Sequence, residues 1–274
     1  MKETIYYSKN EKRKDFILKI LNLYSDQIKG KVFIKPNMVS WEEYPTTTHP
    51  ETLETVFTYL QDKGHEITCG DGWGIDVKEK KVESTTIKQI CEKYGIKFLN
   101  LYKEPMKKFK SPRGFKIKMS SVPFEADSII SLPILKRHDH LRLTGALKMV
   151  VGYFSKFERI KMHMIIAKNR WKMIAEANWF LMKQDISPTH LTIMDAIETL
   201  IHTNEFRHGG EQVHLGYLMA SNCPTILDIY GFDLMKKVEK RYKNYDINLV
   251  PYIKWAIKYG ICGSYEYELK EINL

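Results

Sequence analysis

Three short apolar runs, separated by helical patterns, constrain the fold of this chain more than any other feature. The segments between the runs carry apolar residues at helical spacing and end at glycine, as many helices do. The runs are Lys31–Lys35, His65–Cys69 and Ile96–Leu99, and the helical patterns end at Gly64 and Gly95. Strand and helix in strict alternation favour parallel strands. We therefore predict an α/β fold with a mostly parallel, doubly wound sheet and helices on both faces.

The rest of the chain continues this alternation. We predict further strands at Asp127–Leu132, His190–Asp195 and Leu215–Ala220. We predict helices over Met162–Lys183, Pro224–Lys240 and Val250–Tyr259. Residues 111–121 have the pattern of a β-hairpin. No repeat or linker interrupts the chain, so residues 1–274 are interpreted as a single α/β domain with a small hairpin insertion at about 100–125.

The chain carries 43 basic and 33 acidic residues, a formal charge of +10, and 35 of the basic residues are lysine. Such an excess favours anionic partners. We expect an anionic small molecule; nucleic acid is an alternative that charge alone does not favour. No apolar run is long enough to span a membrane, and the N-terminus lacks a secretory signal. We expect a cytoplasmic protein with no membrane partner.

The four cysteines exclude two kinds of site. Cys69, Cys91, Cys223 and Cys262 lie far apart in sequence. This spacing does not fit a CxxC zinc motif or a ferredoxin-type cluster. We expect reduced, mostly buried thiols and no iron–sulfur cluster.

Polar side chains recur just after the predicted strands. In open α/β sheets, ligands bind beyond the carboxyl ends of the strands. The residues concerned are Lys35, Asn37, Asp71, Lys136, His138 and Asp195. They predict one ligand site, whereas the alternative is that each merely caps the helix that follows.

The densest polar stretch spans residues 132–152. His138 and His140 are two apart, which places both rings on one side of an extended segment, and His163 is the candidate for a third metal ligand. Backbone N–H groups near Thr144 and Gly145, with the ammonium of Lys148, suit an anion. The alternative is a basic surface loop.

Two further features have an ordinary interpretation beside a functional one. Gly209 and Gly210 let a backbone approach a ligand closely, but they also suit a turn. The apolar stripe around Trp171, Ile174, Trp179 and Phe180 is more typical of a core or of a homodimer face than of a surface that binds a cofactor.

The order of several motifs resembles that of the domain-of-unknown-function family 362. The resemblance covers about residues 30–235. The motifs are Ile34–Asn37, Thr46–Glu51, Asp127–Pro133 followed by Lys136 and His138, Leu143–Lys148 with Gly152, and Thr192–Ala196. Met149 stands where that family usually has asparagine.

The spacing of His138, Lys148 and His163 is similar to that of the nickel-pincer lactate racemases. This more distant resemblance implies that His138 is an acid/base, that Lys148 tethers a pincer nucleotide, and that His163 is a nickel ligand. Thr48 and His49 resemble the motif that binds the nucleotide phosphate there, with Pro50 in place of the usual arginine.

Together these patterns predict a small-molecule enzyme with isomerase-like or redox chemistry. The alternative is a non-catalytic protein that binds nucleotide, metal or nucleic acid. The expected cofactor is a divalent metal, nickel or zinc, or a nucleotide-derived group. The expected catalytic residues are His138 and Lys148, and the expected metal ligands are His163 and His140. The expected cofactor-binding residues are Lys35, Asn37, Thr47, Thr48, His49, Asp71, Lys136, Thr144, Gly145, Asp195, Gly209 and Gly210.

Overall fold

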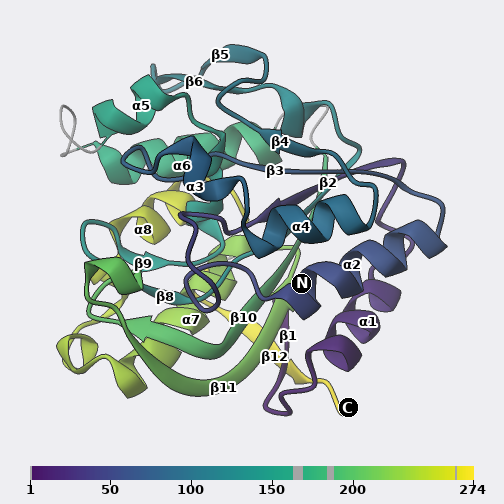
Figure 1. The fold of residues 1–274 in the computed structure, drawn as a ribbon. Helices are drawn as coiled ribbons and strands as arrows, with labels where there is room; N and C mark the ends of the chain where they lie inside the picture. Colours follow the sequence, from purple (N-terminus) through teal and green to yellow (C-terminus); the bar gives the residue numbers. More distant parts are fainter. Residues whose placement is uncertain (1, 163–168, 184–187, 263) are drawn as a thin grey trace.

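An eight-stranded sheet forms the centre of the molecule (Figure 1). The computed structural model describes residues 2–162, 169–183, 188–262 and 264–274. The strand order is β12-β1-β11-β10-β7-β2-β3-β4. The strands are β1 (Glu3–Ser8), β2 (Lys31–Pro36), β3 (Glu66–Asp71), β4 (Phe98–Asn100), β7 (Ser128–Leu132), β10 (Thr189–Ile201), β11 (Glu211–Ser221) and β12 (Tyr267–Glu271).

The sheet is mostly parallel, as predicted. Strand β2 pairs in parallel with both β3 and β7, and β7 pairs in parallel with β10. Only β11 runs against its neighbours β1 and β10. The carboxyl ends of the parallel strands β2, β3 and β7 therefore lie at one edge of the sheet. The candidate site lies at this edge.

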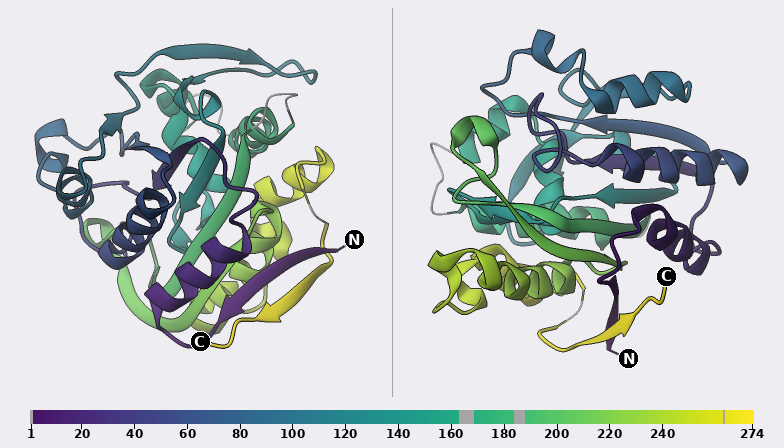
Figure 2. Two further views of the ribbon diagram at one scale, coloured as in Figure 1. Left: turned by 90° about the vertical axis from the view of Figure 1, so that its right-hand side faces the viewer. Right: turned by 60° about the horizontal axis from the view of Figure 1, so that its bottom comes forward.

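Helices cover both faces of the sheet (Figure 2). One apolar cluster includes Ile34 and Ile130 with the buried sides of α1, α2 and α4. The other includes Phe33 and Ile129 with α6, α7 and α8. Neighbouring strand residues thus enter opposite cores, because side chains alternate along a strand. The helices are α1 (Arg13–Leu23), α2 (Pro50–Asp62), α3 (Glu79–Val82), α4 (Thr86–Lys93), α5 (Lys156–Ile160), α6 (Arg170–Met182), α7 (Pro224–Val238) and α8 (Pro251–Lys258).

Helix α2 begins where the sequence predicts. The imidazole of His49 caps it by accepting a hydrogen bond from the Glu51 backbone N–H at 3.1 Å, and Pro50 occupies its first turn. Leu53 and Leu60 on its inner face are fully buried. The predicted helices at 224–240 and 250–259 are likewise present as α7 and α8.

The bounds of two predicted elements differ in the structure. The helix expected over 162–183 is present as α6 from Arg170 to Met182, preceded by a turn at Asn169; residues 163–168 lie outside the described chain. The strand expected to end at Asp195 continues to Ile201, because β11 pairs with it across a bulge between Ala196 and Glu198. Asp195 is therefore inside a strand.

Two hairpins flank the sheet. The predicted hairpin insertion is present as β5 (Met106–Lys110) and β6 (Lys116–Ser120). A second hairpin, β8 (Lys136–His138) with β9 (Arg142–Thr144), follows β7 and was not predicted. It leads into the 3-10 helix η2 (Leu147–Tyr153). No helix in the described part of the chain is long and apolar enough to cross a membrane.

The apolar stripe on α6 packs within the chain. Ile174 and Phe180 are buried in the core, and Trp171 and Trp179 pack against it, half-buried. Of the two interpretations of this stripe, the core is the one that these contacts support.

Candidate functional site

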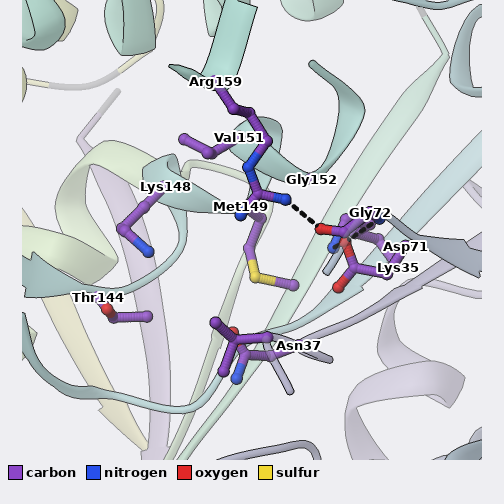
Figure 3. A pocket seen from close by; sticks show the side chains of 11 residues that line it. Lys35, Asn37, Asp71, Gly72, Thr144, Lys148, Met149, Val151, Gly152 and Arg159 are labelled. Atoms are coloured by element: carbon purple, nitrogen blue, oxygen red, sulfur yellow. Dashed lines mark hydrogen bonds and ion pairs between the residues drawn. The ribbon is translucent and has the colours of Figure 1, made fainter. Parts of the chain in front are cut away.

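A cleft with two adjoining chambers lies at the carboxyl ends of β2 and β3. The smaller, inner chamber has a volume of about 30 Å³ and the outer one of about 310 Å³. Val39, Lys148, Val151 and Arg159 line both. Figure 3 shows the inner chamber, whose other lining residues are Lys35, Asn37, Asp71, Gly72, Thr144, Met149 and Gly152.

A buried ion pair forms the floor of the inner chamber. Lys35 Nζ lies 2.7 Å from Asp71 Oδ1, and it also donates to the Pro36 carbonyl. The carboxylate accepts hydrogen bonds from the backbone N–H groups of Met38 and Gly72. Burial lowers the pKa of Lys35, and the charge of Asp71 opposes that shift. The pair is internally satisfied, so it fixes the shape of the floor.

Gly152 allows η2 to approach this floor. A Cβ atom at this position would lie 2.2 Å from Asp71 Oδ1 and 2.7 Å from the Cε of Lys35. Such contacts are shorter than van der Waals distance, so any other residue would force η2 away from the ion pair. The glycine thereby brings Lys148 and Met149, on the same 3-10 helix, over the chamber.

Lys148 lines both chambers and forms no ion pair with any residue that the structure describes. The two acids that act on it are engaged elsewhere, Asp71 with Lys35 and Glu205 with Arg207. Burial lowers the pKa of Lys148 to about 7, and the positive charges of Lys136 and Arg159 add to the shift. Near neutral pH, the side chain therefore exists as both ammonium and amine.

Two more polar groups at the chamber have unused hydrogen-bonding capacity. The hydroxyl of Thr144 and the Nε of Arg159 are buried and have no partner among the described residues. The Nη1 of Arg159 donates to the carbonyls of Gly72 and Trp73 at 2.5 Å and to the Tyr102 hydroxyl. Buried polar groups are rarely left unpaired in proteins. Their presence beside Lys148 is typical of a site that an anion completes.

His138 stands at the end of β8 and lines the outer chamber with His140. Its Nδ1 accepts hydrogen bonds from the backbone N–H groups of His140 and Leu141, both at 3.2 Å. This assigns the proton of the neutral ring to Nε2. Protonating Nδ1 would break both contacts. The acid/base role of His138 stays a prediction.

The predicted metal ligands are only partly described. The ring centroids of His138 and His140 are 6.4 Å apart. His163 lies outside the described residues. In the ranges that the structure describes, no three His, Cys, Asp or Glu side chains are placed to share a metal ion. The metal-binding roles of His163 and His140 stay predictions.

Asp195 and His49 do not line the cleft, contrary to the expected convergence. Asp195 accepts hydrogen bonds from Arg13 at 2.6 Å and from the Tyr44 hydroxyl at 2.9 Å, which ties α1 to the bulge of β10. The His49 ring packs against Tyr44, with ring centroids 4.8 Å apart. Burial, reinforced by the charge of Arg13, lowers the pKa of His49 to about 4. These residues join elements together.

The threonine run before α2 also serves the protein's own framework. Thr47 donates to the Glu42 carbonyl and Thr48 to the Leu132 carbonyl, each at 2.7 Å. Lys136 is buried and donates to the carbonyl of Thr46. Burial lowers the pKa of Lys136 to about 7. Lys136 therefore acts on the cleft through its charge, while the threonine hydroxyls are occupied.

The backbone N–H groups near Gly145 that were expected to bind an anion already donate to a carboxyl group of the protein. Asp228 of α7 accepts hydrogen bonds from Ala146 N at 2.6 Å and from Leu147 N at 3.1 Å. A Cβ at Gly145 would lie 2.1 Å from the same carboxyl. Burial raises the pKa of Asp228 to about 7. The predicted ligand contact is thus an internal cap on η2.

Gly209 and Gly210 form the turn between β10 and β11. Gly209 has a φ of +88°, which ends a 3-10 turn, and neither glycine lines the cleft. Their neighbours Asn204, Glu205 and His208 line the outer chamber instead.

The sequence also did not indicate a role for Arg159, which lines both chambers. Asn204, Glu205, His208 and Arg159 reach the cleft only through the packing of distant segments, and no local sequence pattern predicts that packing.

The fold and the cleft define a doubly wound α/β protein with a cationic site at the carboxyl ends of its strands. The chain belongs to the family described as "Domain of unknown function (DUF362)", whose model matches residues 32–233. No curated protein matches the chain.

Two solved structures are similar to this chain at low sequence identity. The lactate racemase apoprotein from Thermoanaerobacterium thermosaccharolyticum aligns with a TM-score of 0.50 and 12% identity, over 86% of this chain and 57% of that one. A crystal structure of a protein from Thermotoga maritima aligns with a TM-score of 0.49 and 15% identity, over 84% and 59%. This chain spans less than two thirds of either protein.

Proposed function

We propose that this protein is an enzyme that binds an anionic small molecule in the two-chamber cleft. The observation that carries the proposal is the cluster of unsatisfied donors around the inner chamber. The Lys148 ammonium has no ion-pair partner among the described residues, and the hydroxyl of Thr144 and the Nε of Arg159 are buried without acceptors. An oxyanion placed between them would satisfy several donors at once.

Lys148 is the residue best suited to chemistry in this cleft. A lysine with a pKa of about 7 is partly an uncharged amine at neutral pH, so it can accept a proton or act as a nucleophile. His138 lines the outer chamber and would lie beside the bound molecule. The outer chamber, at about 310 Å³, has room for the rest of a small organic anion.

A nucleotide-derived cofactor fits the donors that are present. Lys148, Thr144 and Arg159 are groups that hold phosphate or carboxylate oxygens. When bound, such a group would supply hydride- or electron-accepting chemistry that amino-acid side chains lack. The described residues do not complete a nickel or zinc site, so we derive no metal-dependent step.

The first test is anion binding, measured by calorimetry with inorganic phosphate and with lactate as probes. Lys148→Gln should weaken binding of at least one probe by tenfold or more, because a charge-assisted hydrogen bond is lost. The control is Lys93→Gln, which removes an exposed lysine of α4 that pairs with Glu54 of α2 and does not line the cleft. Equal affinities in wild type and Lys148→Gln would overturn the proposed site.

The second test separates an enzyme from a binding protein. Protein purified from its own source is analysed by intact mass spectrometry and by mapping of the peptide that carries Lys148. It is then incubated with a mixture of small organic acids and sugar phosphates. Consumption of a component by the wild type, but not by Lys148→Gln, supports an enzyme. Binding without consumption supports the non-catalytic alternative.

A further inference from the structure

The hairpin insertion forms a two-stranded ribbon at the edge of the molecule, beside α5 (Figure 1). One face of this ribbon is part of the core. Phe109, Ile117 and Met119 point inward and are buried. The ribbon is joined to the body of the protein by the Ser155 N–H, which donates to the Lys118 carbonyl at 3.0 Å. The ribbon is therefore a fixed part of the surface.

The opposite face carries four lysines in two cross-strand pairs. Lys108 is opposite Lys118, and Lys110 is opposite Lys116. Residues paired across antiparallel strands project to the same side, and all four of these lysines are exposed. We call this surface the lysine face.

The lysine face is not explained by the stability of the fold. Like charges directly opposite each other destabilise a strand pair. In the described chain, none of the four lysines forms an ion pair, whereas some lysines elsewhere on the surface do. Lys2 pairs with Glu266, Lys31 with Glu66, Lys93 with Glu54 and Lys270 with Glu268. Other surface lysines also lack an ion pair, so what distinguishes these four is that they lie directly opposite one another across the strands.

We propose that the lysine face binds the phosphate backbone of double-stranded nucleic acid, a function distinct from the cleft chemistry. A two-stranded β-ribbon has the dimensions to enter the major groove of a duplex. The four side chains are ammonium groups, which contact phosphates without reading bases. Binding is therefore independent of sequence.

An anionic membrane is the competing partner, and the shape of the surface does not favour it. Stable attachment to a membrane needs an apolar group that enters the lipid in addition to basic residues. Phe109, Ile117 and Met119 of the ribbon are buried in the core, and the two cross-strand pairs of the lysine face present only ammonium groups. Such a face is better suited to bind a nucleic-acid duplex than a lipid surface.

The test is a salt titration of duplex binding, measured by fluorescence anisotropy with 20-base-pair DNA and RNA duplexes of unrelated sequence. Four phosphate contacts predict a slope of about −3.6 in log K against log salt, and about a 100-fold loss of affinity between 50 and 200 mM salt. The variant Lys108→Gln/Lys110→Gln/Lys116→Gln/Lys118→Gln should bind at least tenfold more weakly at 50 mM salt, with a slope near zero.

The control variant is Lys2→Gln/Lys31→Gln/Lys93→Gln/Lys270→Gln, which removes the same charge from lysines that pair with glutamates. It should retain the wild-type slope. Circular dichroism and phosphate binding by the cleft report whether each variant is folded. Binding to either duplex that depends on the lysine face supports the proposal. Equal losses in both variants, no duplex binding, or tighter binding to phosphatidylserine vesicles than to duplexes would overturn it.

Discussion

Three buried or half-buried lysines near the cleft differ in how their charge is compensated. Lys35 has a carboxylate at 2.7 Å, Lys136 has only a carbonyl, and Lys148 has neither. Their charges interact strongly because the protein interior screens poorly. The charge of Lys136 is the second cause, after burial, of the lowered pKa of Lys148. Lys136 is thus a positioning residue that sets the protonation of its neighbour from outside the cleft.

Removing the charge of Lys136 should make Lys148 more basic. In Lys136→Met, the carbonyl of Thr46 keeps its hydrogen bond from Asn37, so no acceptor is left unsatisfied. We expect the pKa of Lys148 to rise above about 7 in this variant, because one repulsive charge is gone. NMR titration of ¹³C-methylated lysine resonances, assigned through Lys148→Gln, measures the shift. Lys103→Met, at an exposed position, is the control, and an unchanged Lys148 pKa in Lys136→Met would contradict the coupling.

At the scale of elements, the 3-10 helix η2 is held between a helix and the sheet. Asp228 of α7 accepts from two of its backbone N–H groups, and Gly152 lets its other end approach Asp71. Position and orientation of Lys148 both follow from these two contacts. Truncating the Asp228 side chain would leave two buried donors unpaired, at a cost that mutational data place at about 1–3 kcal/mol.

Asp228→Ala should therefore lower the free energy of unfolding by about 2 kcal/mol and weaken phosphate binding by the cleft. Asp233→Ala lies on the same helix at an exposed position and removes only an ion pair with Lys236. That control should stay within about 0.5 kcal/mol of wild type. Urea denaturation monitored by circular dichroism gives both values. Similar stabilities for the two variants would show that Asp228 does not anchor η2.

For the whole molecule, the buried lysines make stability depend on pH. The pKa of Lys136 is lowered to about 7, far below its value in an unfolded chain. Between these two values, the unfolded state binds more protons than the folded state. The free energy of unfolding therefore rises with pH between these two pKa values, because its slope against pH is proportional to the number of protons bound by the unfolded state minus the number bound by the folded state. The raised pKa values of the buried thiols of Cys69 and Cys223 oppose this trend at higher pH.

We expect the unfolding free energy of wild type, relative to Lys136→Met, to rise by about 1 kcal/mol per pH unit between pH 7 and 8.5. The comparison cancels the contributions of the thiols, which both proteins share. At pH 7, the variant should be equal to wild type or more stable by about 1–2 kcal/mol, since it removes an uncompensated buried charge. Chemical denaturation in a pH series measures the difference. If the difference in unfolding free energy between wild type and Lys136→Met does not change with pH, the pKa of Lys136 is not lowered in the folded protein.

The periodicity of the sequence was enough to predict the alternation of strands and helices over residues 31–99 and the parallel character of the sheet. These follow from local periodicity and from the limits on chain connections. The positions of the polar residues after the predicted strands also indicated that several of them would lie together. Lys35, Asn37, Asp71, Thr144 and Lys148 line one chamber, and His138 lines the adjoining one. Strand ends of a parallel sheet meet at one edge, so this convergence was accessible without coordinates.

Which hydrogen-bonding groups stay available to a ligand depends on the tertiary structure. Several groups look equally suitable in sequence, but each is occupied by a partner within the protein: Thr47, Thr48, the N–H groups beyond Gly145, His49 and Asp195. The partners of Thr47 and His49 are near in sequence, and the others lie far along the chain. Asp228 lies more than 80 residues from the N–H groups that it caps, and Arg13 lies 182 residues from Asp195. A hydrogen bond depends on distance in space, and residue type reveals only that a group can form one. The partner, and hence what stays open for a ligand, is fixed by packing.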